Sequence, residues 1–387
     1  MATSGNTDSR LDRTASLANL ISRLQTRSWL REAKQISNPS FVTKNTEHLV
    51  DLERNSHMPR IIRLHRIGGP ENLKLEHEAS LRQPGKGEVK LRVQAVGLNR
   101  AEAAYIRGFY LERPELPSRI GYEAAGVVEA VGSDVDSNWM GKHVATVPGY
   151  SMNRYGVLGE EAIVPASSLA QYPTRLSPTE AAAIWMQYLT AYGALVKFAD
   201  VHAGDFVVVT AASSSVGLAA IQIVKAQGAT AIASTRTSMK RNELLSLGAD
   251  HVIASEEEDL VDRVKELTGG KGARVVFDAV AGPFLEKLAA AAAPGGIVFE
   301  YGFLSPQPTP FPLVLALTKG LSIRGYAIGE ITRDAERLRA AKQYIFERLE
   351  DGRFQPKIAR VFSLSQSVEA YQYLESNAQI GKVVITI

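Results

Sequence analysis

The sequence predicts an α/β protein that joins a doubly wound parallel sheet to a second, mostly β domain. Three observations lead to this fold class. Residues 205–302 alternate short β-branched runs with helical runs, which is typical of a parallel sheet covered by helices on both faces. Residues 60–170 instead hold strands in which apolar and polar side chains alternate between glycines. The chain closes with another strand, "GKVVITI", which could rejoin the first domain.

The composition limits the classes of function to consider. The chain has 387 residues, 45% hydrophobic and 22% charged, as in an ordinary soluble protein with room for two domains. Its net charge of +3 is spread out, so neither nucleic acid nor a membrane is expected as a partner. The absence of cysteine excludes disulfides, thiolate metal ligands and a cysteine nucleophile. No apolar run approaches the roughly 20 residues that cross a bilayer.

Residues 1–57 differ from the rest and are expected to form a flexible N-terminal extension. They are rich in Ser, Thr, Asn and Arg, and apolar residues recur at helical spacing over 17–24. A disordered extension, a targeting or docking helix, and an added start before Met58 are the alternatives. Acidic residues in the segment argue against a transit peptide. We expect a cytoplasmic protein, with organelle targeting by this extension as the alternative.

The mostly β domain is expected over residues 58–184. Its strands include "EVKLRVQAVGLN", residues 88–99, and "YEAAGVVEAVGS", residues 122–133. The rhythm changes with a helical run over residues 178–195.

The doubly wound domain is expected over residues 185–322, with five strands that alternate with helices. The strands are expected at 205–211, 230–235, 251–254, 274–280 and 296–302, and the helices at 216–227, 239–248, 259–270 and 283–293. The remaining segment, 323–387, carries a long helix that Gly352 stops, and its last strand would complete the first domain.

A turn of small residues, "AASSSVG" at Ala211–Gly217, lies between the first strand and the first helix of this domain. Small residues let backbone amides at a helix N-terminus approach a pyrophosphate, where the helix dipole favours negative charge. The usual fingerprint would place three glycines here, and only Gly217 is one. A serine-rich helix cap without a ligand is the alternative. The predicted cofactor contacts are Ser213, Ser214, Ser215, Val216 and Gly217.

The end of the second strand predicts which cofactor binds. NAD-binding proteins place an acidic residue there to bond the ribose hydroxyls, whereas this chain has Ser234, Thr235, Arg236 and Lys240. Hydroxyls and cations suit a 2′-phosphate. We therefore expect NADPH, with a solvated helix start as the alternative interpretation.

Several motifs together resemble the medium-chain dehydrogenase/reductase superfamily, and within it the zinc-free quinone oxidoreductase and enoyl reductase branch. The motifs are "GLNRAEAAYIRGFY", "PSRIGYEAAGVVEAVG", "WMQYLTAYGAL", "AASSSVGLAAIQIVKAQGA", "LGADHVI" and "GKVVI". The resemblance covers nearly all of residues 60–387. It implies a GroES-like catalytic domain, a central Rossmann-type domain, and often a homodimer joined through the Rossmann sheets.

The resemblance also argues against a catalytic zinc. Zinc-containing relatives place a cysteine near Asn99 and a histidine where Tyr122 stands, and neither is present here. Tyr122 and Glu123 alone cannot supply a tetrahedral site. We expect Glu123 to brace the fold through local hydrogen bonds and Tyr122 to line the emptied pocket.

Without a metal, bound NADPH is suited to reduce a carbon–carbon double bond conjugated to a carbonyl. Negative charge develops on the carbonyl oxygen and a proton later reaches the α carbon. A tyrosine is neutral at pH 7 and can donate that proton. Tyr110 resembles the tyrosine that enoyl-thioester reductases of this superfamily use, although quinone reductases also have it. A cleft-wall tyrosine without a proton role is the alternative.

Three further residues are assigned through the resemblance. Asn99 matches an asparagine beside the nicotinamide, with a turn-forming asparagine as the alternative. Thr190 matches a threonine that faces the nicotinamide, with a helix-interior threonine that bonds its own backbone as the alternative. Lys382 matches a lysine often directed towards the cofactor, and a salt-bridged surface lysine is an equal interpretation.

Tyr301, Gly302 and Phe303 are expected at the cofactor, because ligands of doubly wound sheets bind beyond the carboxyl ends of the strands. Leu158 departs from the family pattern, since it replaces an aromatic residue that commonly lines the nicotinamide pocket. The proline-rich stretch 304–314 could be a loop over the site.

The sequence thus favours a zinc-independent, NADPH-dependent oxidoreductase that reduces quinones or α,β-unsaturated carbonyl compounds. One alternative is an enoyl-thioester reductase acting on acyl chains carried by coenzyme A or a carrier protein, with residues 1–57 as a docking helix. Another is an NADPH-binding protein with little turnover.

Overall fold

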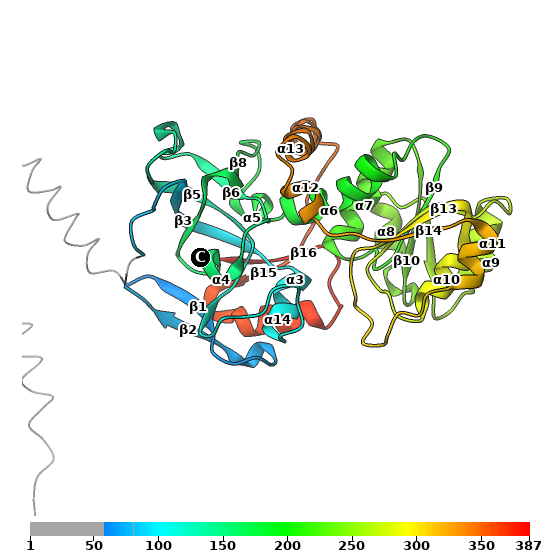
Figure 1. Ribbon diagram of the computed structural model, residues 1–387, viewed down its shortest axis with the longest axis horizontal. Coiled ribbons are helices and arrows are strands. Elements are labelled where there is room, and N and C mark those ends of the chain that lie inside the picture. Colours follow the sequence, from blue (N-terminus) through cyan, green and yellow to red (C-terminus); the bar gives the residue numbers. More distant parts are fainter. Residues whose placement is uncertain (1–57, 80) are drawn as a thin grey trace, which may run out of the picture. The chain divides into compact units, whose positions relative to one another are not determined.

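Two large sheets and a small one organise the unit Pro59–Ile387 in the computed structural model (Figure 1). The structure describes residues 58–79 and 81–387. The expectations for residues 1–57, including the amphipathic run, lie outside the described residues. Among the described residues, no helix has both the length and the apolar character to cross a membrane.

The first large sheet has seven strands in the order β15-β16-β3-β5-β6-β8, with β7 also paired to β3. Its strands are β3 (Glu88–Gly97), β5 (Glu123–Val131), β6 (His143–Thr146), β7 (Glu161–Pro165), β8 (Leu169–Ala170), β15 (Ile358–Ser363) and β16 (Lys382–Thr386). The strands expected over 88–99 and 122–133 are confirmed as β3 and β5. The last strand does rejoin this domain, because β16 pairs antiparallel with β3 and parallel with β15.

A separate small sheet has three strands in the order β2-β1-β4. Its strands are β1 (Arg60–Leu64), β2 (Leu73–His77) and β4 (Ser118–Arg119). The helices between these and the later strands are α3 (Arg100–Ile106), α4 (Met152–Tyr155) and α5 (Pro178–Ala181).

The second large sheet is parallel throughout and has six strands in the order β11-β10-β9-β12-β13-β14. Its strands are β9 (Phe206–Val209), β10 (Thr230–Thr235), β11 (His251–Ala254), β12 (Ala273–Asp278), β13 (Ala292–Glu300) and β14 (Ser322–Gly325). This is the strand order of a doubly wound dinucleotide-binding domain, as predicted. The sequence predicted five of these strands and missed β14, whose four residues "SIRG" contain a single β-branched residue.

The helices of this domain also follow the predicted alternation. They are α7 (Ser215–Ala226), α8 (Arg241–Ser246), α9 (Leu260–Leu267), α10 (Phe284–Ala291) and α11 (Leu313–Lys319). After β14 come α12 (Gly329–Thr332), α13 (Ala335–Glu350) and α14 (Ser367–Glu375). The domain boundary expected between residues 322 and 323 falls inside β14, so the doubly wound sheet extends slightly further than predicted. The other boundaries stay predictions.

The helical run expected over 178–195 is interrupted. It forms α5, then α6 (Trp185–Tyr192), and then a π-helix over Gly193–Phe198. Because α6 begins after the break, its first backbone N–H groups have no hydrogen-bond partner within the helix. The buried carboxylate of Glu123 accepts the backbone N–H of Met186 at 3.1 Å.

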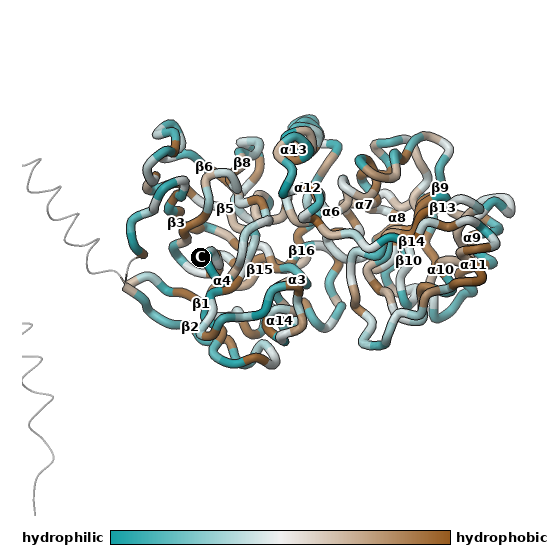
Figure 2. The backbone as a smooth tube through the Cα atoms, viewed as in Figure 1, coloured by the Kyte–Doolittle hydropathy of each residue, from teal (hydrophilic) through white to brown (hydrophobic). Residues whose placement is uncertain are grey.

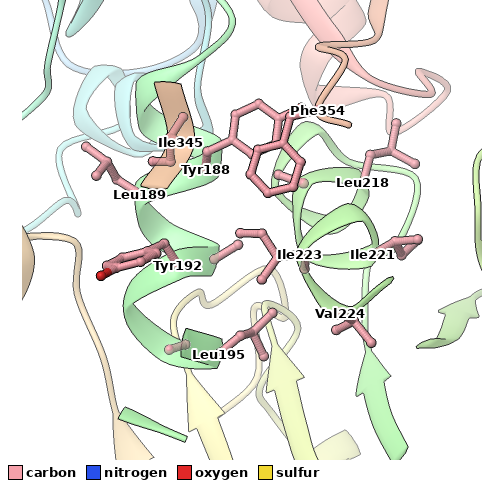
Figure 3. Packing of buried hydrophobic residues seen from close by; sticks show 14 of the residues in the cluster. Tyr188, Leu189, Tyr192, Leu195, Leu218, Ile221, Ile223, Val224, Ile345 and Phe354 are labelled. Atoms are coloured by element: carbon pink, nitrogen blue, oxygen red, sulfur yellow. The ribbon is translucent and has the colours of Figure 1, made fainter. Parts of the chain in front are cut away.

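Helix α6 packs between the two large sheets in the main apolar core. Tyr188 of α6 stacks on Phe354 with ring centroids 4.9 Å apart and planes 7° from parallel. Figure 3 shows these rings beside Ile223 of α7 and Ile345 of α13. Residues from α6, α7 and α13 therefore share one apolar core.

Candidate active site

The turn Ala211–Gly217 follows β9 at the carboxyl end of the parallel sheet, where β10 and β12 lie on either side. Ser214 caps α7, because its Oγ accepts the backbone N–H of Gly217 at 3.0 Å. A Cβ at Gly217 would lie 2.7 Å from the carbonyl oxygen of Ala211, so only glycine fits. Ala211 itself has φ +45°, in the region that favours glycine. The close approach of helix and turn fits a dinucleotide pyrophosphate.

The other predicted residues of the turn divide into two groups. Ser215 and Val216 begin α7, where backbone N–H groups have no partner within the helix. Ser213 is bonded away from the helix, since its carbonyl accepts the N–H of Gly381 at 2.9 Å. The turn is therefore joined both to α7 and to the segment that precedes β16. Contact of these residues with a cofactor stays a prediction.

Lys240 differs from its predicted role. Its ammonium donates to the hydroxyl of Ser213 at 3.0 Å and to the carbonyls of Asn377 and Gln379 at 2.8 and 2.9 Å. An ammonium has three N–H donors, so each has a protein partner and none is left for a phosphate. Burial, with the nearby positive charge of Arg236, lowers the pKa of Lys240. In this structure Lys240 therefore joins the turn Ala211–Gly217 to residues 377–379 through hydrogen bonds.

The end of β10 matches the predicted ribose side of the site more closely. Ser234 is buried in the strand and its carbonyl accepts the N–H of Ala212 at 3.2 Å. Thr235 ends the strand, and Arg236 follows with an exposed side chain. This end of the strand therefore offers hydroxyls and an exposed cation where NAD-binding proteins place a carboxylate.

A buried ion pair joins the end of the chain to the seven-stranded sheet. The Nζ of Lys382 donates to Glu123 Oε2 and to Asn99 Oδ1, both at 2.6 Å. The side chains of Lys382 and Glu123 have no exposed area. Two expectations are corrected by this cluster. Glu123 forms long-range bonds and not local ones, and Lys382 is salt-bridged but is not on the surface. Direct contact of Lys382 with a cofactor stays a prediction.

Asn99 caps a helix, which corresponds to the turn-forming alternative that the sequence offered for it. It precedes α3 as a cap, and its backbone N–H donates to Glu102 Oε2 at 2.6 Å. Its side-chain N–H₂ donates to the carbonyl of Gly97 at 3.2 Å, which directs Oδ1 towards Lys382. The asparagine is thus oriented by both donors and acceptors. Its position beside a nicotinamide stays a prediction.

Glu102 is a member of this cluster that sequence reasoning missed. Its carboxylate also accepts the N–H of Tyr122 at 3.1 Å. Complete burial raises the pKa of Glu102 to about 7, against the opposing effect of Lys382. The signal was visible in the sequence, because Asn99 and Glu102 have the spacing of a helix capping box.

Tyr110 lies against Tyr122, with ring centroids 6.3 Å apart. Burial, reinforced by the carboxylates of Glu102 and Glu112, raises the pKa of Tyr110 to about 12. Burial also raises the pKa of Tyr122, and its ring contacts Tyr150 at 5.9 Å between centroids. Both hydroxyls therefore hold their protons across the physiological pH range. Tyr110 has the protonation state that a proton donor needs.

Two expectations about the pocket wall are answered by local geometry. The hydroxyl of Thr190 donates to the carbonyl of Met186 at 2.6 Å, as a helix-interior threonine does. Its contact with a cofactor stays a prediction. Leu158 is fully buried and bonds Ile62 through its backbone, so it belongs to the core of the first domain.

Tyr301, Gly302 and Phe303 follow β13 at the carboxyl edge of the parallel sheet. The ring of Tyr301 stacks on Phe277 with centroids 4.0 Å apart. Its buried hydroxyl lies near Ser214 but has no well-directed hydrogen-bond partner among the described residues. A buried hydroxyl without a partner is uncommon in native proteins and leaves a donor for a ligand. Phe303 is 48% exposed.

A pair of carboxyl groups at the same edge was not predicted. Asp278 and Glu300 lie opposite each other on the neighbouring strands β12 and β13. Asp278 accepts the N–H groups of Val280 and Ala281 at 3.0 and 2.7 Å, and the hydroxyl of Thr210. Both oxygens of Glu300 are buried and lack such partners among the described residues. Burial, with the neighbouring Asp278, raises the pKa of Glu300 to about 8.

The fold and the site together define a class of protein: an oxidoreductase in which a doubly wound sheet offers a dinucleotide site beside a mostly β catalytic domain. Residues 85–174 match the alcohol dehydrogenase GroES-like domain family, and residues 215–343 match the zinc-binding dehydrogenase family. The chain belongs to the quinone oxidoreductase-like branch of the medium-chain dehydrogenase/reductase superfamily, as the sequence motifs predicted.

Individual relatives show how far the similarity extends. The quinone oxidoreductase of Sus scrofa is 32% identical over 328 residues, which cover 84% of this chain and 97% of the relative. The 2-haloacrylate reductase of a Burkholderia species is 29% identical over 328 residues, 83% of this chain and 97% of the relative. The solved structure of Escherichia coli quinone oxidoreductase in complex with NADPH has a TM-score of 0.78 and 30% identity. The structural match covers 85% of this chain and 100% of the Escherichia coli chain.

Removal of Lys382 should destabilise the protein more than removal of both partners of the ion pair. Lys382→Met leaves the Glu123 carboxylate buried without a counter-charge, and breaking such a pair typically costs about 3–5 kcal/mol. The double variant Lys382→Met with Glu123→Gln should recover a large part of that loss. Urea unfolding of the single and double variants measures the difference. A loss under about 1 kcal/mol for Lys382→Met would contradict the role of the pair.

Glu300 should make stability depend on pH. Its pKa in the folded protein, about 8, lies above the ordinary value of 4.5, so folding favours the protonated form. The stabilisation is complete below pH 4.5 and is lost as the pH rises through 8. Glu300→Gln keeps a neutral donor beside Asp278, so its unfolding temperature should fall less between pH 5 and pH 9. Parallel curves for variant and wild type would show that Glu300 does not titrate in this range.

Proposed function

We propose that this protein is a zinc-independent, NADPH-dependent reductase of quinones or α,β-unsaturated carbonyl compounds. One observation carries the proposal: the turn Ala211–Gly217 and the buried cluster of Lys382, Glu123 and Asn99 are joined by the same short segment. Gly381 donates to Ser213 of the turn, and the next residue, Lys382, bonds Asn99 and Glu123. The names of the two relatives, a quinone oxidoreductase and a 2-haloacrylate reductase, support this range of substrates.

The residues of the chain suggest how the reaction would be divided. Bound NADPH supplies a hydride. Tyr110 is partly buried and keeps its hydroxyl proton, and it would deliver that proton to the α carbon of an enone or to the oxygen of a quinone. The amide of Asn99, fixed by Lys382 and by the carbonyl of Gly97, would orient the reacting groups. The buried ring of Tyr122 and the partly buried ring of Tyr110 would limit access of water to this side of the site.

Zinc independence is supported by the hydrogen bonds and the ion pair that the nearby side chains already form. Glu123, the carboxylate nearest to the position of a zinc ligand in related enzymes, already bonds Lys382 and the N–H of Met186. Among the described residues, no three side chains of His, Asp or Glu converge as a metal site would require.

The preference for NADPH is supported by the end of β10. Thr235 and the exposed Arg236 stand at the position that a carboxylate occupies in NAD-binding proteins. The solved relative from Escherichia coli was crystallised with NADPH. Lys240 could join the phosphate only by exchanging one of its three present partners.

A homodimer joined through the parallel sheets is the assembly that we propose. Strand β14 is an edge strand of the six-stranded sheet, and the neighbouring helix α11 is apolar and exposed (Figure 2). Leu313, Val314 and Leu317 of α11 are 56%, 72% and 74% exposed. Apolar side chains gathered on one helix face are typical of an interface.

Arg236→Ala should raise the KM for NADPH by about tenfold or more and change the KM for NADH little, because only NADPH carries a 2′-phosphate. Lys240→Met should also lower the unfolding temperature, since Lys240 bonds residues 377–379, whereas Arg236→Ala should not. Steady-state kinetics with both cofactors and thermal unfolding separate the two cations. Equal losses for NADPH and NADH in Arg236→Ala would overturn the cofactor assignment.

Tyr110→Phe should lower kcat for an enone by about 10²-fold or more, because a general acid typically contributes that much. NADPH affinity, measured by fluorescence titration, should stay as in the wild type. Tyr150→Phe offers a matched control, because its hydroxyl bonds the backbone of Tyr122 and does not reach Tyr110 by any described contact. Unchanged turnover in Tyr110→Phe would remove this tyrosine from the mechanism. A panel of quinones, enones and enoyl thioesters identifies the preferred substrate.

Leu317→Arg should convert the dimer into a monomer, because it places a charge on the apolar face of α11. Sedimentation velocity of variant and wild type gives the mass of each. Met239→Arg, at a 91% exposed position outside α11, is a control for added charge. A monomeric wild type would contradict the proposed assembly.

A further inference from the structure

Two exposed phenylalanines from the two domains contact each other. Phe109 follows α3 of the catalytic domain, and Phe303 follows β13 of the dinucleotide-binding domain. Their ring centroids are 6.1 Å apart, and the planes meet edge to face at 63°. Phe109 is 57% exposed and Phe303 is 48% exposed. The pair is thus a contact between the two domains in which both side chains remain about half exposed.

The backbone on each side of this contact is held in place. The N–H of Phe109 donates to the carbonyl of Ala104 in α3 at 3.2 Å. On the other side, the N–H of Leu304 donates to the carbonyl of Ala279 at 3.0 Å. Each ring therefore projects from a fixed backbone, although its side chain is half exposed. Such a position is preorganised for binding, because little main-chain order remains to be gained.

The location of the pair connects it to the proposed reaction. Phe109 directly precedes Tyr110, and Phe303 follows Tyr301, whose buried hydroxyl lacks a well-directed partner among the described residues. Leu111 and Leu304, close to Phe109 and Phe303 in the sequence, are also apolar and are 79% and 40% exposed. Exposed aromatic and aliphatic side chains gathered beside a site indicate an apolar ligand surface.

We propose that Phe109 and Phe303 form an aromatic clamp that selects planar, ring-bearing apolar substrates over small acyclic ones. The clamp rests on the proposed reductase function, because it places the substrate ring beside Tyr110. A polycyclic quinone can stack on the open ring faces and bury them from water, whereas a short acyclic enone covers little of either ring. The clamp therefore acts on affinity for the substrate and not on hydride or proton transfer.

The clamp is tested on the full-length chain with two acceptors, 9,10-phenanthrenequinone and 3-penten-2-one, and NADPH as the reductant. Phe109→Ala and Phe303→Ala should each raise the KM for the quinone about tenfold. In Phe109→Ala, the kcat/KM for the enone should change less than about twofold. Phe303→Tyr, which keeps an aromatic ring, should behave as wild type. Phe311→Ala is the matched control, since Phe311 is 60% exposed on the same loop but outside the pair.

Binding without turnover separates the clamp from the reductase proposal. Isothermal titration of phenanthrenequinone into the protein saturated with NADP⁺ should show about tenfold weaker binding in each alanine variant. Selective loss of quinone affinity confirms the clamp even if no acceptor is reduced, in which case the proposed reductase function fails. Absence of quinone binding by the wild type overturns the clamp. Equal quinone affinity in all variants, or equal losses for quinone and enone, also overturns it.

Discussion

The buried ion pair between Lys382 and Glu123 is the constraint on which the rest of the structure depends. Neither charge is exposed, so each must have its partner in place. Glu123 begins β5, and it also satisfies the first turn of α6 through Met186. Lys382 begins β16 and bonds Asn99 at the start of α3. A single pair of charges therefore fixes two strands and α3 of the catalytic domain and the start of α6.

The segment before Lys382 extends this constraint to the cofactor side. Residues 377–381 are bonded to Lys240 and to Ser213, so one stretch of backbone joins the turn Ala211–Gly217 to the buried ion pair. The apolar contact of α6 with α7 supports the same arrangement from within the core. The position of the turn Ala211–Gly217 relative to Asn99 is thus set by hydrogen bonds as well as by packing.

Local patterns in the sequence were sufficient to predict most of the fold. Contacts between residues far apart in the sequence could not be predicted from them. The strand and helix alternation and the turn at Ala211–Gly217 depend on neighbouring residues, and all were predicted. Strand β14 was missed because four residues with one β-branched side chain carry almost no periodicity. The bonds of Lys240 and the pairing of Glu123 with a lysine 259 positions away could not be derived, because no local pattern reports them. Glu102 was within reach, since its spacing from Asn99 marks a capping box.

The place of β16 between β15 and β3 also sets an order for folding during synthesis. The ribosome adds Lys382 259 positions after Glu123, and during that interval the carboxylate has no counter-ion to be buried with. The parallel sheet is complete once Gly325 has emerged, before β15 or β16 exists. The dinucleotide-binding domain can therefore fold while the catalytic sheet still lacks an inner strand. Strand β7 can pair with Glu88–Arg92 of β3 early, so the nascent chain would expose only the Ala95–Gly97 end of this edge until β16 is made.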